Sequence, residues 1–533
     1  MRVPSQASKA SRRSRPAATR AEAATRPSLT ATPAVEATTD AVVVTAFEDG
    51  LSSHAEAVDA ALGGALTEMR DAGEFRGRFA QRATLRTLGR LPTRHVLLLG
   101  LGRRRELDMF RLTNAFQFAG DALRARGVGS VSAYLDDAVV AATGRDGSGP
   151  AAVADAVRAV ATGILLSSFD PGTSKTDPEA RPPIGVVAIG GVAVDAAAVQ
   201  RDLEVADVLA LATNRVRTWA AAPSNLLTPT LLAESARQLY QGTGLELDVL
   251  EKADLEREGM GALLGVARGS DEPPVMITVR HDGGPVAGPR LALVGKGITF
   301  DTGGISLKPS AGMDLMRDDM GGGAAVLAAM WAIARLGLRV NVVGVVPATE
   351  NMPSGHAYKP GDVLVSSSGK TIEVTDTDAE GRIILADGLT KARRLGATHI
   401  VDVATLTGSA VVALGHSASG LMSNDELLTG LVKRAAVSAG DRVAELPMFP
   451  EYAVALESRV ADVRNLGGRQ AGTINAAFFL REFVEELPWV HLDIAGSGWN
   501  SQQDQTQIPQ GPTGAPVRTL VHLARLFAEL DGA

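Results

Sequence analysis

Short apolar runs that alternate with helical stretches constrain the fold of this chain most strongly. The runs are bounded by turn residues, as is typical of buried strands. Strands that alternate with helices form parallel or mixed sheets with helices packed on their faces. The sequence therefore predicts an α/β fold, with strands at 41–47, 95–100, 184–189, 291–294, 340–346, 399–403 and 490–494, and helices at 106–125, 151–166, 202–221, 322–336 and 380–395.

The length of the chain, 533 residues, is too great for one compact core, so two domains are expected. The first 40 residues contain seven basic and three acidic residues and almost no large apolar side chain. Burial there cannot offset the entropy cost of ordering the chain. We expect a disordered basic tail at 1–40, a smaller N-terminal α/β domain at 41–195, a connecting helix at 196–222, and a larger C-terminal domain with a central mixed sheet flanked by helices at 223–533.

Composition limits the function classes and the location. The chain has no cysteine, which excludes disulfides and thiolate nucleophiles and leaves oxygen and nitrogen ligands for any metal. No apolar run approaches the roughly 20 residues that span a membrane. The formal charge of −7 argues against nucleic acid as the main partner. We expect a cytoplasmic protein; the alternative for the basic tail is an organelle transit peptide, whose composition is similar.

The segment Asp376-Thr-Asp-Ala-Glu-Gly-Arg382 carries the clearest chemical signal. Asp378 and Glu380 are two residues apart, and side chains at that spacing on extended backbone point the same way. Carboxylates held close together repel one another unless a cation lies between them. This spacing predicts a divalent metal site.

A second group of polar residues follows the predicted strand at 291–294. It contains Lys296, Asp301 and Lys308 among glycine-rich turns, and Asp319 precedes an apolar helix. Open α/β sheets place their sites at the carboxyl ends of strands, so these side chains are expected near the carboxylate pair. An aspartic protease is excluded, because Asp301-Thr-Gly is not matched by a second D-T-G or D-S-G. The H-E-x-x-H helix of zincins does not occur either.

Together these segments resemble the leucyl aminopeptidases, the cytosol aminopeptidase family of metallopeptidases. The segment 376–382 is similar to the family's N-T-D-A-E-G-R-L signature, with Asp376 in place of Asn and Ile383 in place of Leu. The resemblance covers residues 200–533 and extends to the segments 295–308, 402–408 and 491–496. In the N-terminal third the likeness is one of layout, and it implies a macro-like α/β domain there.

The resemblance implies a site of two divalent metal ions and a substrate pocket. Its expected metal ligands are Lys296 and Asp319 on one ion, Asp378 on the other, and Asp301 and Glu380 bridging both. Its expected catalytic pair is Lys308 and Arg382, with a bicarbonate ion at Arg382 as general base. Its expected side-chain pocket is formed by Met316, Thr405, Gly408 and Ala495, together with Gly498.

The charges of these residues agree with that assignment. Four carboxylates carry four negative charges, which two divalent ions balance, and an unbalanced buried charge costs several kcal/mol. Lys296 would bind as a neutral amine, because two neighbouring cations lower its pKa far below its usual value of about 10.4. Oxygen and amine ligands suit Mn²⁺ or Zn²⁺ best, with Mg²⁺ a further candidate.

We therefore expect a metal-dependent aminopeptidase that releases N-terminal residues, preferentially leucine, from peptides. Two adjacent ions would make hydroxide available at neutral pH, and Lys308 would stabilise the oxyanion that its attack produces. The resemblance further implies a homohexamer. Two alternatives stay open: a dimetal phosphoesterase, which would hydrolyse nitrophenyl phosphate and not leucine anilides, and DNA binding through the basic tail.

Overall fold

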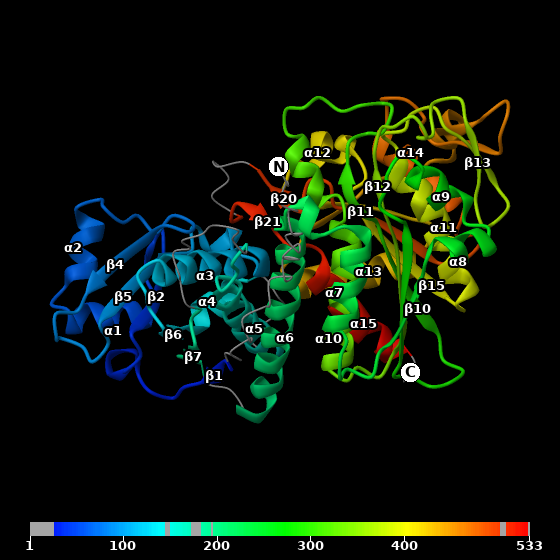
Figure 1. The fold of residues 1–533 in the computed structure, drawn as a ribbon. Helices are drawn as coiled ribbons and strands as arrows, with labels where there is room; N and C mark the ends of the chain where they lie inside the picture. The colour runs from blue at the N-terminus through cyan, green and yellow to red at the C-terminus, as the bar shows by residue number, and fades with distance from the viewer. Residues whose placement is uncertain (1–25, 144–149, 172–182, 193–195, 502–507, 531–533) are drawn as a thin grey trace, which may run out of the picture.

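The computed structural model describes residues 26–143, 150–171, 183–192, 196–501 and 508–530, and it shows two α/β domains joined by a long helix (Figure 1). Within the described residues, the N-terminal domain holds a seven-stranded sheet and the C-terminal domain a nine-stranded sheet. Both sheets mix parallel and antiparallel pairs and have a hydrophobic core on each face. The predicted α/β fold class is confirmed.

The N-terminal sheet is built around strand β2. Its elements are β1 Ser28–Leu29, β2 Ala41–Phe47, β3 Gly50–Leu51, β4 Arg82–Arg86, β5 His95–Gly100, β6 Ser130–Tyr134, β7 Val186–Gly190, α1 Ser53–Ala61, α2 Ala65–Asp71, α3 Met109–Arg124, α4 Asp137–Ala142 and α5 Pro150–Leu166. The strand order is β1–β7–β6–β2–β5–β4, and β3 pairs with β2. Successive side chains of β2 point to opposite faces of the sheet and so enter two cores. Val43 packs with α3 and α5, whereas Val42 and Val44 pack with α1.

Part of the segment expected as a disordered tail belongs to this domain. Strand β1 pairs in parallel with Ala188 and Ile189 of β7. Ala34 and Ala37 are buried, and the Thr39 hydroxyl lies 2.9 Å from Ser132 Oγ. The expectation does not hold for residues 26–40, because backbone pairing at a sheet edge does not need large apolar side chains. The rest of the expected tail, residues 1–25, lies outside the described residues.

The C-terminal sheet has its parallel strands at the centre. Its strands are β8 Glu246–Leu250, β9 Val275–Asp282, β10 Arg290–Gly295, β11 Gly297–Asp301, β12 Asn341–Asn351, β15 His399–Ala404, β16 Ser419–Ser423, β17 Val443–Glu445 and β19 Trp489–Asp493. The order is β17–β16–β19–β15–β10–β12–β9–β8, with β11 beside β12. Strands β12, β10, β15 and β19 are parallel neighbours, so their carboxyl ends meet at one edge. That edge is where a site is expected.

Helices cover both faces of this sheet. They include α7 Pro229–Leu239, α9 Gly261–Ala267, α10 Gly321–Arg335, α11 Glu380–Arg394, α12 Gly408–Leu414, α13 Glu426–Ala439, α14 Gly472–Arg481 and α15 Val517–Leu530, with the 3₁₀ turn η4 at Met313–Asp318. Leu291 and Leu293 of β10 pack with α10 and α15, whereas Ala292 and Val294 pack with α11 and α14. The apolar run of β10 is thus explained by burial on both sides.

Helix α6, Ala196–Ala221, takes part in the packing of both domains. Leu203 and Ala206 belong to the N-terminal core, and Leu209 and Trp219 belong to the C-terminal core. Figure 1 shows α6 standing between the two sheets. The connecting helix therefore packs against the hydrophobic cores of both domains.

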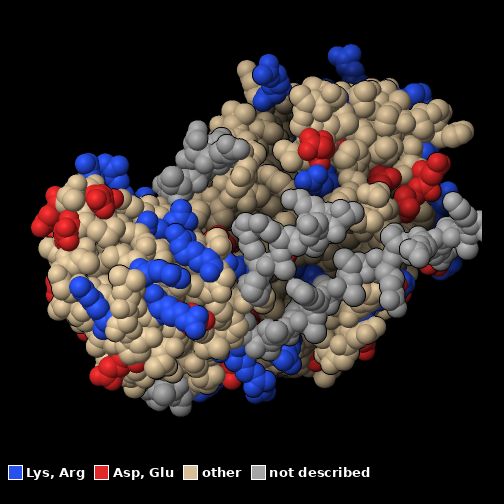
Figure 2. Space-filling model, turned by 60° about the vertical axis from the view of Figure 1, so that its left-hand side comes forward, with Lys and Arg blue, Asp and Glu red and all other residues tan. Residues whose placement is uncertain are grey.

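The surface carries charges of both signs. Figure 2 shows lysine and arginine side chains gathered on the front of the N-terminal lobe. Arg82 and Arg86 are exposed on β4, the edge strand of that domain, where charged side chains discourage pairing with another chain. A helix long and apolar enough to cross a membrane does not occur among the described residues.

Candidate metal centre

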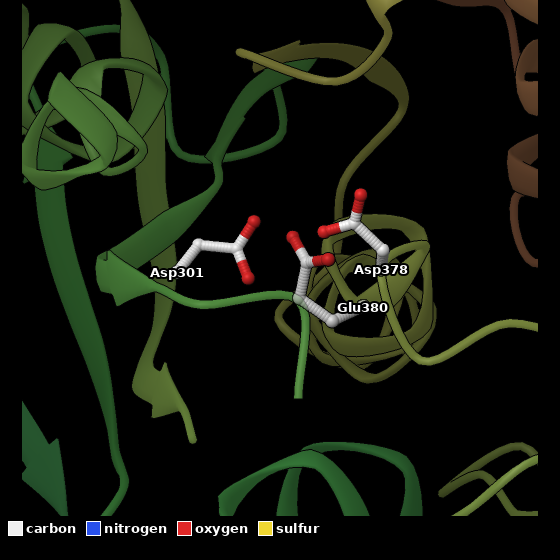
Figure 3. Close-up of side chains that lie close together, drawn as sticks. All are labelled: Asp301, Asp378 and Glu380. Carbon is white, nitrogen blue, oxygen red and sulfur yellow. The ribbon is translucent and has the colours of Figure 1, made fainter. Parts of the chain in front are cut away.

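The five predicted metal ligands converge at the carboxyl edge of the C-terminal sheet. Asp301, Asp378 and Glu380 offer oxygen atoms within 4.8 Å of one another, and Figure 3 shows their carboxylates pointing toward a common centre. Lys296 Nζ lies 2.7 Å from Asp319 Oδ1 and 2.8 Å from Glu380 Oε1. The side chains come from the ends of β10 and β11, the end of η4 and the start of α11. This convergence is what a two-metal site requires.

The backbone that brings Asp378 and Glu380 together is not the extended segment that the sequence predicts. The segment is not extended, because Thr377 and Asp378 lie in a turn and Glu380 begins helix α11. The Asp376 carboxylate accepts a hydrogen bond from the backbone N–H of Asp378 at 2.9 Å, which holds the turn. The helix N-terminus favours Glu380, since unpaired backbone N–H groups there attract negative charge.

Two glycines make room for this arrangement. A Cβ atom on Gly381 would lie 2.5 Å from Lys296 Cε, so the glycine lets the lysine side chain pass α11. Gly303 has a φ of +86°, and a Cβ there would lie 2.9 Å from Asp378 Oδ1. Both glycines are therefore explained by close packing at the centre.

Protein groups alone do not balance the charge of this centre. Four carboxylates face two ammonium groups; the second, Lys308 Nζ, lies 2.7 Å from Asp301 Oδ2 and also pairs with Asp378. Among the described residues, the buried oxygens Asp319 Oδ2 and Glu380 Oε2 have no hydrogen-bond partner. Such orphaned oxygens are costly, and a cation would satisfy them. The donor set, carboxylates and an amine without sulfur, fits Mn²⁺ or Zn²⁺.

Burial and mutual repulsion shift the pKa values at the centre. Burial, and then the carboxylates of Glu380 and Asp301, raise the pKa of Asp319 well above its usual range despite Lys296. Burial raises the pKa of Asp378 to about 6. Burial lowers the pKa of Lys296, but the facing carboxylates outweigh it and raise the net value. A divalent ion among these groups would reverse that sign, because it replaces the attraction of the carboxylates by repulsion.

Arg382 lies on the first turn of α11, beside the centre. It is 4% exposed, and its Nη1 donates to the backbone carbonyl of Asn465 at 2.8 Å. Its Nε has no hydrogen-bond partner in the described part of the chain. Burial lowers the pKa of Arg382 to about 10, so the side chain keeps its charge at neutral pH. A buried charged group with a free donor is suited to a small anion.

The residues expected around the side-chain pocket lie on segments that border the centre. The Thr405 hydroxyl donates to Asp319 Oδ1 at 2.8 Å, and the Thr405 carbonyl accepts from Lys296 Nζ at 2.9 Å. Gly498 is a neighbour, since a Cβ on it would lie 3.7 Å from Thr405 Cγ2. The others are Met316 on η4, Gly408 at the start of α12, and Ala495 just after β19.

Two residues that support the centre were not singled out from the sequence. Asp493, at the end of β19, accepts from the Thr407 hydroxyl at 2.7 Å and from the backbone N–H of Leu406 at 3.3 Å. It thereby holds the loop after β15. Asn351, at the end of β12, donates to Asp301 Oδ1 at 2.8 Å. Asp493 could have been identified from the sequence, because an acidic residue that ends an apolar strand is a recognisable pattern. Asn351 follows no such pattern.

Comparisons with known proteins agree with this geometry. The chain matches the cytosol aminopeptidase family, N-terminal domain at residues 43–178 and catalytic domain at 214–521. It is 42% identical over 492 residues to a probable cytosol aminopeptidase of Alkaliphilus metalliredigens, covering 91% of this chain and 96% of the relative. A probable cytosol aminopeptidase of Geobacter sp. is also 42% identical over 492 residues, covering 92% and 98%.

Two solved structures share the whole fold. A tomato leucine aminopeptidase mutant has a TM-score of 0.82 and 31% identity, covering 94% of this chain and 96% of that one. The bottromycin maturation enzyme BotP in complex with Mn has a TM-score of 0.77 and 35% identity, covering 92% and 100%. The chain therefore belongs to the cytosol aminopeptidase family and is a hydrolase of that family.

Proposed function

We propose that this protein releases N-terminal amino acids, preferentially leucine, from peptides in the cytoplasm, using two divalent ions at the carboxylate centre. The observation that carries the proposal is the pair of buried oxygens, Asp319 Oδ2 and Glu380 Oε2, that lack a partner among the described residues. Manganese is named with one solved relative, and both Mn²⁺ and Zn²⁺ suit the donors. When bound, such a pair of ions supplies hydroxide at neutral pH.

Each proposed ligand is assigned to one of the two ions or to both. Lys296 and Asp319 would hold one ion, Asp378 the other, and Asp301 and Glu380 both. Lys296 must give up its proton to act as a ligand. Its 3% side-chain exposure favours the neutral amine once cations replace the contacts with Asp319 and Glu380.

Lys308 would bind the carbonyl oxygen of the scissile peptide bond. Its side chain is 20% exposed against 3% for Lys296, so Lys308 is the amine that an incoming substrate can reach. As an ammonium it would stabilise the negative charge that develops on that oxygen. Arg382 would hold a bicarbonate ion, which supplies a general base when bound; its unpartnered Nε supports this role.

Side-chain selection would come from the surfaces of Met316, Thr405, Gly408 and Ala495, with Gly498 beside Thr405. Small residues there leave an apolar space for a leucine side chain, and broad specificity follows because one methylene changes binding by only about 1–3 kcal/mol. The proposed homohexamer is consistent with Val412, Phe449 and Val454, which are 90%, 58% and 62% exposed in the single chain. Large exposed apolar side chains are often covered in an assembly.

The test is turnover of leucine p-nitroanilide by chelator-treated protein, with Mn²⁺, Zn²⁺, Mg²⁺ or Co²⁺ added back singly. We expect activity to require metal, and we expect no hydrolysis of nitrophenyl phosphate. The opposite substrate preference would support a phosphoesterase and overturn the proposal.

The ligand assignment has a separate test in Glu380→Gln. Elemental analysis should show fewer than two metal equivalents per chain, because Glu380 is proposed to bridge both ions. The matched control is Glu426→Gln, which removes an exposed glutamate at the same position of helix α13. Two equivalents retained in Glu380→Gln would contradict its role as a ligand.

A further inference from the structure

A polar cavity lies at the junction of the two domains. It has a volume of about 50 Å³ and is lined by residues of α3 and α6, by loops around positions 416–419 and 441–442, and by the segment 508–518. The described residues that line it include none of the proposed metal ligands or catalytic residues. Since one water needs roughly 10–15 Å³, the space accommodates about four waters or one small anion.

Three arginines and one carboxylate occur among the described residues that line this cavity. Arg518 pairs with that carboxylate, Asp441, at 2.5 Å. Both oxygens of Asp441 are engaged, because the second accepts from the Thr519 hydroxyl at 2.7 Å. Arg442 pairs with Asp108 at 2.7 Å and has a side chain that is 32% exposed. The lining therefore carries more positive than negative charge.

Of these three arginines, Arg217, on α6, is the one without an ion-pair partner among the described residues. It is 5% exposed, and its donors go to neutral groups, the backbone carbonyls of Pro512 and Leu166, each at 2.9 Å. Burial lowers the pKa of Arg217 to about 10; Asp121 opposes that shift, and the guanidinium of Arg518 adds to it. Arg217 is attracted by the Asp121 carboxylate but makes no ion pair with it, so an anion in the cavity would still be attracted.

Gln117, on α3, is a second observation that points to a bound ligand, independent of the arginines. Its side chain lines the cavity and is 5% exposed; in the described part of the chain its amide makes no hydrogen bond, although it is not among the fully buried atoms that lack a partner. Buried amides are nearly always paired. An oxyanion in the cavity would accept from this amide and from the adjacent guanidinium groups.

We propose that this cavity is a binding site for a small oxyanion of the phosphate class, held by Arg217, Arg442 and Gln117. Guanidinium groups match tetrahedral oxyanions in both charge and geometry. The three side chains come from α6, from the C-terminal domain and from α3, so the bound anion ties the two domains together. Binding should therefore stabilise the folded protein, and the stabilisation should grow with the logarithm of the anion concentration once that exceeds the Kd.

The experiment follows thermal unfolding of the full-length, manganese-loaded protein during a titration with inorganic phosphate. We expect Tm to rise with the logarithm of the phosphate concentration above the Kd, a rise that potassium chloride of equal ionic strength does not produce. Gln117→Leu and Arg442→Gln should each weaken the apparent phosphate affinity by about tenfold, the usual effect of losing one charge-assisted hydrogen bond. Arg434→Gln, which removes an exposed arginine of α13, is the matched control and should leave the affinity unchanged.

Phosphate can also bind to the metal ions, so the titration is repeated with Asp378→Ala. The expected result is an unchanged phosphate affinity in that variant. The proposal is overturned if phosphate raises Tm no more than potassium chloride of equal ionic strength does. It is equally overturned if the shift disappears in Asp378→Ala but persists in Gln117→Leu and Arg442→Gln, because the anion then binds at the metal centre. Circular dichroism of each variant verifies that it is folded.

Discussion

Lys308 and Arg382 are the residues whose proposed roles lie in the chemical step and not in metal binding. Lys308→Ala and Arg382→Ala should each reduce kcat by at least about tenfold while both metal equivalents stay bound, because each group acts on charge that develops in the transition state. Steady-state kinetics and elemental analysis of the same samples measure this. Lys433→Ala, which removes a half-exposed lysine of α13, is the control. Turnover near that of the unchanged protein in both variants would refute the two roles.

Gly381 has no side chain, yet its small size is expected to determine where Lys296 lies and therefore how tightly the centre binds metal. In Gly381→Ala the new methyl group would lie 2.5 Å from Lys296 Cε, so the lysine must shift away from Asp319 and Glu380. We expect weaker metal binding, measured by competition with a chelator. In the control Gly430→Ala, a helical glycine with open space around it, the change should stabilise the protein by about 0.5–1 kcal/mol and leave metal affinity unchanged. Equal metal affinities in both variants would show that Gly381 does not position Lys296.

At the scale of elements, the burial of Asp121 on helix α3 makes the stability of the folded protein depend on pH. Burial raises the pKa of Asp121 from 3.8 to about 6, although Arg217, Arg124 and Arg82 oppose the shift. The folded state therefore holds this proton more firmly than the unfolded state, and stability falls as pH rises from about 4 to 6.

Asp121→Asn should remove that penalty. We expect a gain of about 1–3 kcal/mol in the free energy of unfolding at pH 7 and no gain below pH 3.8, where the carboxyl is protonated in both states. Urea unfolding at the two pH values measures it, with the exposed Asp271→Asn as control. A gain of the same size at both pH values would show that the effect is not one of ionisation.

At the scale of the whole molecule, the shared helix α6 should make the two domains unfold together. All four tryptophans, Trp219, Trp331, Trp489 and Trp499, lie in α6 or the C-terminal domain, so their fluorescence reports that half only. Far-ultraviolet circular dichroism reports both halves. We expect the two signals to give the same midpoint, because α6 cannot leave one core without exposing its other face.

A single substitution tests this coupling. Leu203→Ala empties part of the N-terminal core and should destabilise by about 2–5 kcal/mol. It should lower the midpoint of tryptophan fluorescence even though no tryptophan belongs to that core. Leu427→Ala, at a position 82% exposed, should leave the midpoint unchanged. A fluorescence midpoint that does not move in Leu203→Ala would mean that the domains unfold independently.

Much of the fold could be read from local patterns. The strands predicted at 41–47 and 95–100 coincide with β2 and β5, and the helix predicted at 380–395 is α11, Glu380–Arg394. These elements are buried on one or both sides, and burial leaves a periodic apolar pattern. Strands β8 and β9 were not predicted. Exposed and polar positions weaken the pattern in β8, whereas β9 begins with five buried residues, 275–279, whose apolar run the sequence analysis did not single out.

The sequence by itself determined the family and the residue types of the candidate centre, because residue types and short spacings, such as that from Asp378 to Glu380, can be read along the chain. Only the tertiary structure decided how those groups meet. The hydrogen bond from the Thr377 hydroxyl to the Gly303 carbonyl, the passage of Lys296 beside Gly381, and the support of Asp301 by Asn351 each join segments far apart in the chain. Such contacts depend on strand register and packing, which no local pattern records, and the same is true of the cavity that brings Gln117, Arg217 and Arg442 together.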